Sequence, residues 1–236
     1  MSLTDLTSLN DSDDAGSVRT LSALACAAAA NPASVCIWPQ WVPVALEALR
    51  GSHIPVCAVT NFPAGAAAPD IAAAETAAVV AAGAAEVDVV FPYRALLSGD
   101  SRVGLSLVRA CREACGERAL LKVILETGQL KSAQNIRQAA QIAIDGGADF
   151  LKTSTGKTQP AATPEAAGVL IEVIAAARPD RSIGFKASGG IRTIDDALVY
   201  LTLYEQKFGP GSASARNFRI GASGLFKELM AAAGGN

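Results

Sequence analysis

A lysine that ends an apolar stretch is the first sign of chemistry in this chain. Residues 148–152 read Ala-Asp-Phe-Leu-Lys, and the polar segment Thr-Ser-Thr-Gly-Lys follows. Because strand side chains alternate in direction, Phe150, Lys152 and Ser154 are expected to share one face. A charged lysine on a buried face is costly unless it is paired or neutral. Lys152 is therefore either a strand end whose stem reaches solvent or a functional amine.

Other strand-like segments carry ionisable residues in the same setting. Lys122, Lys186 and Asp88 each lie inside an apolar run. Two neighbouring ammonium groups disfavour each other's charge, which lowers the pKa of one of them. A neutral lysine can attack a carbonyl and form a Schiff base, and a carboxylate beside it can move a proton. These residues predict a metal-free carbon–carbon lyase that needs no cofactor.

The elements that must position these residues alternate along the whole chain. Apolar, strand-like runs are separated by alanine-rich helical patterns, such as those at 69–82 and 132–145. Thr163 and Thr193 have the sequence context of helix N-caps. This alternation predicts a single-domain α/β protein, a (β/α)8 TIM barrel over residues 1–236 whose first strand starts almost at the N-terminus. The expected strands are 3–6, 34–38, 55–60, 86–91, 119–126, 148–152, 182–187 and 217–222.

The competing fold is a doubly wound nucleotide-binding sheet, but its motifs are incomplete. After Gly209-Pro210-Gly211, the third glycine of a dinucleotide fingerprint is replaced by Ser214. Gly156-Lys157-Thr158 resembles the end of a phosphate-binding P-loop, yet Leu151 stands where that motif requires glycine. The barrel is therefore the favoured fold.

Composition narrows the class of protein. Half of the residues are apolar, 18% are charged and the net charge is -2, which favours a compact fold and gives no footprint for nucleic acid or an anionic membrane. No apolar run approaches the roughly 18 residues of a membrane span, and the N-terminus lacks signal-peptide features, so the cytoplasm is the expected compartment. With one histidine, the five cysteines are expected to be reduced core residues rather than zinc ligands.

Glycine-rich loops indicate where a phosphate would bind. In a (β/α)8 barrel the active site lies at the carboxyl ends of the strands, and the loops after the last strands commonly bind phosphate through backbone N–H groups. Gly189-Gly190 and the segment 221–224 occupy those places, and Gly156-Lys157 adds a positive charge. A phosphorylated small molecule is the predicted ligand.

Together these segments resemble the deoxyribose-phosphate aldolase family, from Asp5 to about Leu229. The segments that carry the resemblance are 5–11, 60–63, 86–93, 121–128, 150–157 and 184–193. The resemblance implies a class I aldolase that reversibly cleaves 2-deoxy-D-ribose 5-phosphate to acetaldehyde and D-glyceraldehyde 3-phosphate. It also implies that Lys152 forms the Schiff base, that Lys186 lowers the pKa of Lys152 and that Asp88 relays protons.

The same resemblance implies roles for residues that hold the substrate. The supporting or pocket-lining positions are Asp5, Thr7, Leu9, Cys36, Phe62, Lys122 and Thr155, and those of the phosphate loops are Gly156, Lys157, Gly189, Gly190, Gly221 and Ser223. A homodimer is common in the family. The chain departs from it at Gly224, which replaces a second serine, and in having no tyrosine after Tyr204, so we expect water to protonate the enamine.

Two other functions stay open on the sequence. One is a Schiff-base lyase of the same fold that acts on a different phosphorylated sugar or keto acid. The other is a non-catalytic phosphosugar-binding barrel, which the presence of both Lys152 and Lys186 disfavours.

Overall fold

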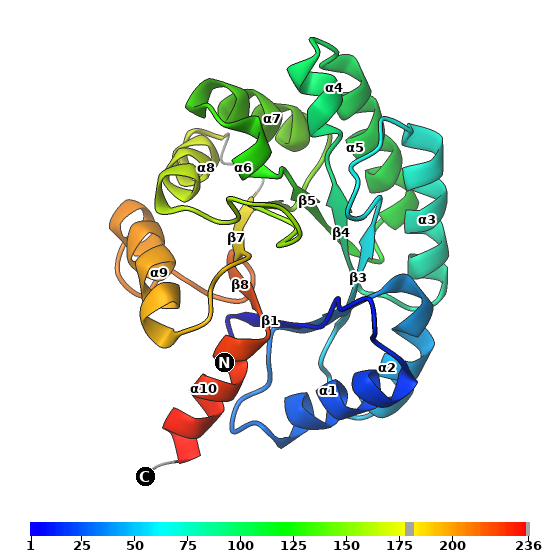
Figure 1. Ribbon diagram of the computed structural model, residues 1–236, viewed down its shortest axis with the longest axis vertical. Helices are drawn as coiled ribbons and strands as arrows, with labels where there is room; N and C mark the ends of the chain where they lie inside the picture. Colours follow the sequence, from blue (N-terminus) through cyan, green and yellow to red (C-terminus); the bar gives the residue numbers. More distant parts are fainter. Residues whose placement is uncertain (178–181, 235–236) are drawn as a thin grey trace.

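A closed barrel of parallel strands forms the centre of the computed structural model, which describes residues 1–177 and 182–234. The strands pair in chain order, and β1 also pairs with β8, so the sheet closes on itself. The helices form a ring outside the strands (Figure 1). This architecture confirms the predicted (β/α)8 barrel. The strands are β1 (Thr4–Thr7), β2 (Ser34–Ile37), β3 (Val56–Thr60), β4 (Glu86–Val90), β5 (Leu120–Ile124), β6 (Phe150–Lys152), β7 (Gly184–Ser188) and β8 (Phe218–Ala222).

Helices connect successive strands, as the parallel order requires. No helix among the described residues is long and apolar enough to cross a membrane. The helices are α1 (Ala15–Ala27), α2 (Val42–Ala48), α3 (Pro69–Ala81), α4 (Tyr93–Leu97), α5 (Arg102–Cys115), α6 (Thr127–Leu130), α7 (Ala133–Asp145), α8 (Pro164–Ala176), α9 (Ile194–Phe208) and α10 (Gly224–Gly234), with a 3₁₀ turn η1 (Pro39–Trp41) before α2.

The predicted helix starts are capped as expected. The Thr163 hydroxyl accepts a hydrogen bond from the backbone N–H of Ala166 at the start of α8. Thr193 forms a capping box with Asp196 at the start of α9. Such caps satisfy backbone donors that the first helical turn leaves free, and each contributes about 1 kcal/mol.

Strand register determines which side chains fill the barrel. Asp88 pairs with Lys122 across β4 and β5, and Lys152 pairs with Lys186 across β6 and β7. Glycine makes room for two of the interior side chains. A Cβ atom at Gly184 would lie 2.2 Å from the Phe150 ring, and one at Gly221 would lie 3.0 Å from Cε of Lys186. The Phe150 ring therefore requires glycine at position 184, and a side chain at position 221 would press on Lys186.

All strand boundaries agree with the predictions to within two residues, and β1 begins at Thr4. The predicted strand 119–126 ends earlier, at Ile124, because Glu126 adopts a left-handed backbone with φ of 56°. Gly235 and Asn236, the predicted tyrosine-free end of the chain, lie outside the described residues.

Candidate active site

One carboxylate accepts hydrogen bonds from three ammonium groups inside the barrel. Asp88 on β4 is fully buried, and its Oδ2 accepts hydrogen bonds from Lys152 Nζ and Lys186 Nζ, both at 2.7 Å. Its Oδ1 accepts a third from Lys122 Nζ at 2.9 Å. The lysines predicted from separate strands thus meet at one residue.

A second group of charges lies beside the first. Asp5 on β1 pairs with Lys186 at 2.5 Å and with Arg219 at 2.6 Å. Glu86 on β4 pairs with Arg219 at 3.0 Å and with Lys122 at 2.6 Å. Lys122 and Lys186 therefore connect the pair Asp5 and Glu86 to Asp88, so the charged interior is one continuous network.

These contacts shift the pKa values of the buried groups. Burial alone would raise the pKa of Asp88, but Lys122, Lys152 and Lys186 hold it well below its usual range. Burial likewise opposes ionisation of Asp5, and the neighbouring cations again hold its pKa below the usual value. Burial would lower the pKa of Lys122 and Lys186, yet the carboxylates beside them raise both. The network therefore keeps these four groups ionised at neutral pH.

The charges in the network do not balance. Three carboxylates (Asp5, Glu86, Asp88) face four cationic groups (Lys122, Lys152, Lys186, Arg219). Among the described residues, Lys152 pairs with one carboxylate, whereas each other cation pairs with at least two. If one amine in this interior is neutral, the fewest ion pairs are therefore lost when that amine is Lys152.

Two thiols and an apolar cluster also lie beside Asp88. Cys57 Sγ is 3.2 Å from Asp88 Oδ1, and Cys36 Sγ is 3.9 Å from Oδ2. With Val59 they form a small buried cluster against which Leu9, Trp38 and Phe62 pack. Together these six residues, here called the apolar wall, present an uncharged surface beside Asp88.

The spacing of Cys36, Cys57 and Asp88 would also suit a metal ion, since their ligand atoms lie within 4.8 Å of one another. Both Asp88 oxygens, however, already accept hydrogen bonds from ammonium groups, and Lys122 Nζ is 3.3 Å from Cys57 Sγ. A divalent cation there would stand beside several positive charges. The residues present therefore favour amine chemistry over metal binding.

A pocket of about 280 Å³ opens at the carboxyl ends of β1, β6, β7 and β8. Lys157 lies at its rim, 3.4 Å from Asp11 and with Nζ 5.8 Å from the centre of the Trp38 ring. Cationic side chains and glycine backbone at one end suit an anionic group. The predicted residues that line this pocket are Thr7, Leu9, Thr155, Gly156, Lys157, Gly189, Gly190, Gly221 and Ser223.

The other predicted residues lie elsewhere around the site. Asp5 and Lys122 are fully buried within the charged network. Cys36 and Phe62 belong to the apolar wall, where the Phe62 and Trp38 rings meet edge to face at 5.4 Å. Although Thr155 borders the pocket, its hydroxyl donates to Glu126 Oε2 at 2.6 Å.

Several residues of the site escaped the sequence analysis. In the sequence, Glu86 and Arg219 lie inside apolar strand-like runs, as Lys186 does. A charged residue in such a run is the feature that could have identified both. Arg192 lines the pocket directly after Gly189-Gly190. Glu126 ends the apolar run 119–126, where the active site was expected, but its left-handed backbone and its contact with Thr155 could not be read from the sequence.

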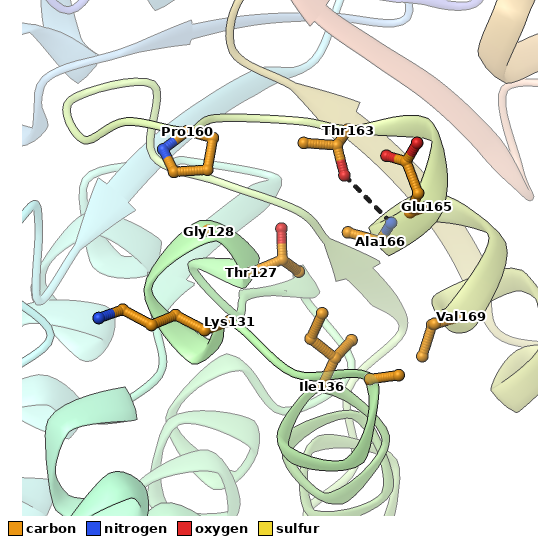
Figure 2. Close-up of a pocket in the computed structure, with 10 residues that line it drawn as sticks. Thr127, Gly128, Lys131, Ile136, Pro160, Thr163, Glu165, Ala166 and Val169 are labelled. Atoms are coloured by element: carbon orange, nitrogen blue, oxygen red, sulfur yellow. Dashed lines mark hydrogen bonds between the residues drawn. The ribbon is translucent and has the colours of Figure 1, made fainter.

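A second cavity lies apart from this chemistry. Its volume is about 170 Å³, and it lies between α6, the start of α7 and the start of α8 (Figure 2). The buried Thr127 hydroxyl points toward the space between Pro160 and Thr163 and has no hydrogen-bond partner in the described part of the chain. None of the predicted site residues lines this cavity.

Known proteins share this architecture. A crystal structure of a candidate deoxyribose-phosphate aldolase from Coccidioides immitis is similar with a TM-score of 0.84 and 31% identity, covering 96% of this chain and 84% of that one. Another from Toxoplasma gondii has a TM-score of 0.86 and 27% identity, covering 97% and 90%. The family model described as DeoC/LacD family aldolase matches residues 1–218. The chain therefore belongs to the DeoC/LacD family of aldolases.

Proposed function

We propose that this aldolase reversibly cleaves 2-deoxy-D-ribose 5-phosphate to acetaldehyde and D-glyceraldehyde 3-phosphate through a Schiff base on Lys152. The observation that carries the proposal is the shared oxygen of Asp88, which holds Lys152 and Lys186 together at 2.7 Å each. Lys152 is the amine with the fewest ion pairs, and its side chain is 2% exposed while that of Lys186 is fully buried. It is therefore the amine best placed to meet a substrate carbonyl.

The reaction begins when neutral Lys152 attacks the aldehyde carbon of the open-chain sugar. Loss of water gives a protonated imine, which can accept the electron pair of a neighbouring carbon–carbon bond. Asp88 lies within hydrogen-bonding distance of Lys152 and is kept ionised by the lysines around it, so it can take up and return protons, directly or through a water.

Bond cleavage follows removal of the proton from the C3 hydroxyl. The C2–C3 bond breaks, D-glyceraldehyde 3-phosphate leaves, and the two-carbon fragment stays on Lys152 as an enamine. Protonation of the enamine carbon and hydrolysis of the imine then release acetaldehyde. The apolar wall at Cys36 and Cys57 offers this fragment an uncharged surface.

The pocket supports a phosphorylated substrate of small size. Its volume of about 280 Å³ is at the lower end of ligand sites. Lys157, Arg192 and the glycines at 189 and 190 can bind a phosphate at the rim while the aldehyde carbon reaches inward. Two-point binding of this kind would orient the carbonyl toward Lys152.

Borohydride trapping tests the proposal. The folded protein is incubated with acetaldehyde, reduced, and analysed by intact mass and peptide mapping. An ethyl group on Lys152, absent without acetaldehyde and absent from Lys152→Met, is the expected result. Protein that remains folded and gains no ethyl group on Lys152 would exclude the Schiff-base mechanism. Parallel assays with 2-deoxy-D-ribose 5-phosphate and with other phosphorylated sugars identify the substrate.

A further inference from the structure

Two cysteines face each other across neighbouring strands beside the reactive amines. Cys36 on β2 and Cys57 on β3 are direct partners in the strand register, and both are fully buried. Their sulfurs lie within 4.8 Å of each other and of an Asp88 oxygen. Adjacent strands are about 4.8 Å apart, and disulfides join Cα atoms roughly 4.4–6.8 Å apart. A bond between the two sulfurs therefore needs little backbone movement.

We propose that Cys36 and Cys57 form a reversible disulfide when the protein meets a peroxide, and that this bond switches the site off. The modification uses none of the Schiff-base chemistry. Its effect on activity rests on the proposed aldolase function, whereas formation of the disulfide can be measured without any aldolase assay.

The oxidation proceeds in two balanced steps. The Cys36 thiolate attacks one oxygen of hydrogen peroxide, the O–O bond breaks, and hydroxide leaves and becomes water by taking a proton. This gives a sulfenic acid on Cys36. The Cys57 sulfur then attacks the Cys36 sulfur, the S–O bond breaks, and the hydroxyl leaves as water with the proton of Cys57. Two thiols are oxidised by two electrons, and one peroxide is reduced to two waters.

The surroundings assign different roles to the two thiols. A hydrogen bond from Cys57 lowers the pKa of Cys36, although burial opposes the shift. Burial, followed by the same hydrogen bond, raises the pKa of Cys57 well above its usual value. Cys36 is thus the better initial nucleophile and Cys57 the resolving thiol. Hydrogen peroxide is smaller than acetaldehyde. Under the proposed function acetaldehyde reaches Lys152, which is buried as Cys36 is, so hydrogen peroxide can reach Cys36.

The disulfide would alter the surroundings of Asp88, the carboxylate that accepts hydrogen bonds from the three buried lysines. Cys57 now contacts both Asp88 Oδ1, at 3.2 Å, and Lys122 Nζ, at 3.3 Å. Joining the sulfurs removes both S–H donors from the side of Asp88 and draws Cys57 toward Cys36. The apolar wall also changes shape where the two-carbon fragment would lie. We expect activity to fall at least tenfold.

A second pair of buried cysteines provides an internal control. Cys111 and Cys115 lie one turn apart on α5, and burial raises their pKa to about 11 and about 12. Since the thiolate is the species that reacts with peroxide, this pair is expected to stay reduced. The remaining cysteine, Cys26, is exposed and can report non-specific oxidation.

The test treats the full-length protein with hydrogen peroxide, blocks free thiols after denaturation, and maps the peptides. The expected wild-type product has lost two hydrogens, contains a peptide linking Cys36 to Cys57, and regains activity with dithiothreitol. Cys57→Ala and Cys57→Ser should form no such link. Each variant's activity is compared with its own untreated sample, and the Cys111→Ser/Cys115→Ser variant should behave as the wild type.

Three results would overturn the proposal. The first is that Cys36 and Cys57 both remain free to alkylation after treatment of the folded protein. The second is a link that joins another pair of cysteines, and the third is that dithiothreitol restores no activity in protein carrying the mapped link. If the link forms and reverses but no trapping with acetaldehyde occurs, the proposed Schiff-base mechanism fails and the disulfide stands.

Discussion

The barrel interior holds two neighbouring groups of charges that differ in how completely they are paired. Around Glu86 and Arg219, each ionic side chain meets at least two partners of opposite charge. Around Asp88, Lys152 and Lys186 share a single oxygen. The first arrangement suits a fixed ion-pair network, because every buried charge is compensated. The second leaves one amine weakly paired, which is what reactivity requires.

The largest expected effect comes from Lys152→Met in the weakly paired group. The variant removes the proposed nucleophile and the surplus positive charge, so activity should fall by about 10⁴-fold or more while stability changes little. Steady-state kinetics and urea unfolding measure the two effects. Retention of activity would show that another amine forms the Schiff base and would end the functional contrast between the two groups.

Glu86→Gln should produce the opposite pattern in the well-paired group. It leaves Lys122 and Arg219 short of a buried carboxylate, a change that typically costs about 3–5 kcal/mol of unfolding free energy. The activity of the folded fraction should fall by less than about tenfold, since Glu86 has no contact with Lys152 among the described hydrogen bonds and ion pairs. Urea unfolding and steady-state kinetics on the same variant measure the two effects. If activity and stability fell by the same free energy, the charges around Glu86 and those around Asp88 would act as one group.

Alkaline stability should be limited by thiols rather than by the charged interior. The raised pKa values of Cys111 and Cys115 favour folding below the unfolded thiol pKa, and this stabilisation is lost progressively as the pH rises from that value to about 11 and about 12. At pH 10 the loss should be roughly 1.5 kcal/mol for each thiol. Lys122 and Lys186, whose pKa values are raised, lose their contribution only at higher pH.

Urea unfolding between pH 7 and pH 10.5 measures this loss. Cys36 and Cys57 shift in opposite directions and partly offset each other. A Cys111→Ser/Cys115→Ser variant should therefore show a flatter pH dependence than the wild type. An unchanged slope would place the alkaline sensitivity in the charged interior instead.

The smallest effect is expected at the rim. Lys157→Met should raise the KM for 2-deoxy-D-ribose 5-phosphate about tenfold, or about 1.4 kcal/mol, because Lys157 is one of several groups able to contact the phosphate. The rate with unphosphorylated 2-deoxyribose should not change. Lys227→Met, an exposed position on α10, is the matched control for removal of a charge. A similar loss with both sugars would show that Lys157 serves the pocket rather than the phosphate.

The sequence was sufficient for the barrel and for the residues around Asp88. Apolar strand-like runs and glycine-ended helices are patterns that local chemistry determines, and the predicted strand boundaries differ from those of the structure by at most two residues, as at the end of β5 before the left-handed Glu126. The number of ion pairs at each lysine depends on strand register, so the weak pairing of Lys152 was not readable from spacing. The same limit applies to the contact of Cys57 with Asp88 and to that of Glu126 with Thr155.

The carboxylate shared by Lys122, Lys152 and Lys186 also constrains how this sequence can evolve. Replacing Asp88 would remove a partner from three cations at once and leave Lys152 with no carboxylate among the described ion pairs, so an evolutionary path to another residue without loss of fitness requires compensating changes on separate strands. Substitutions at positions linked through one acceptor are strongly non-additive. Descendants of this protein should therefore keep all four residues or lose them together, and lineages that abandon the chemistry should show their replacement as a block.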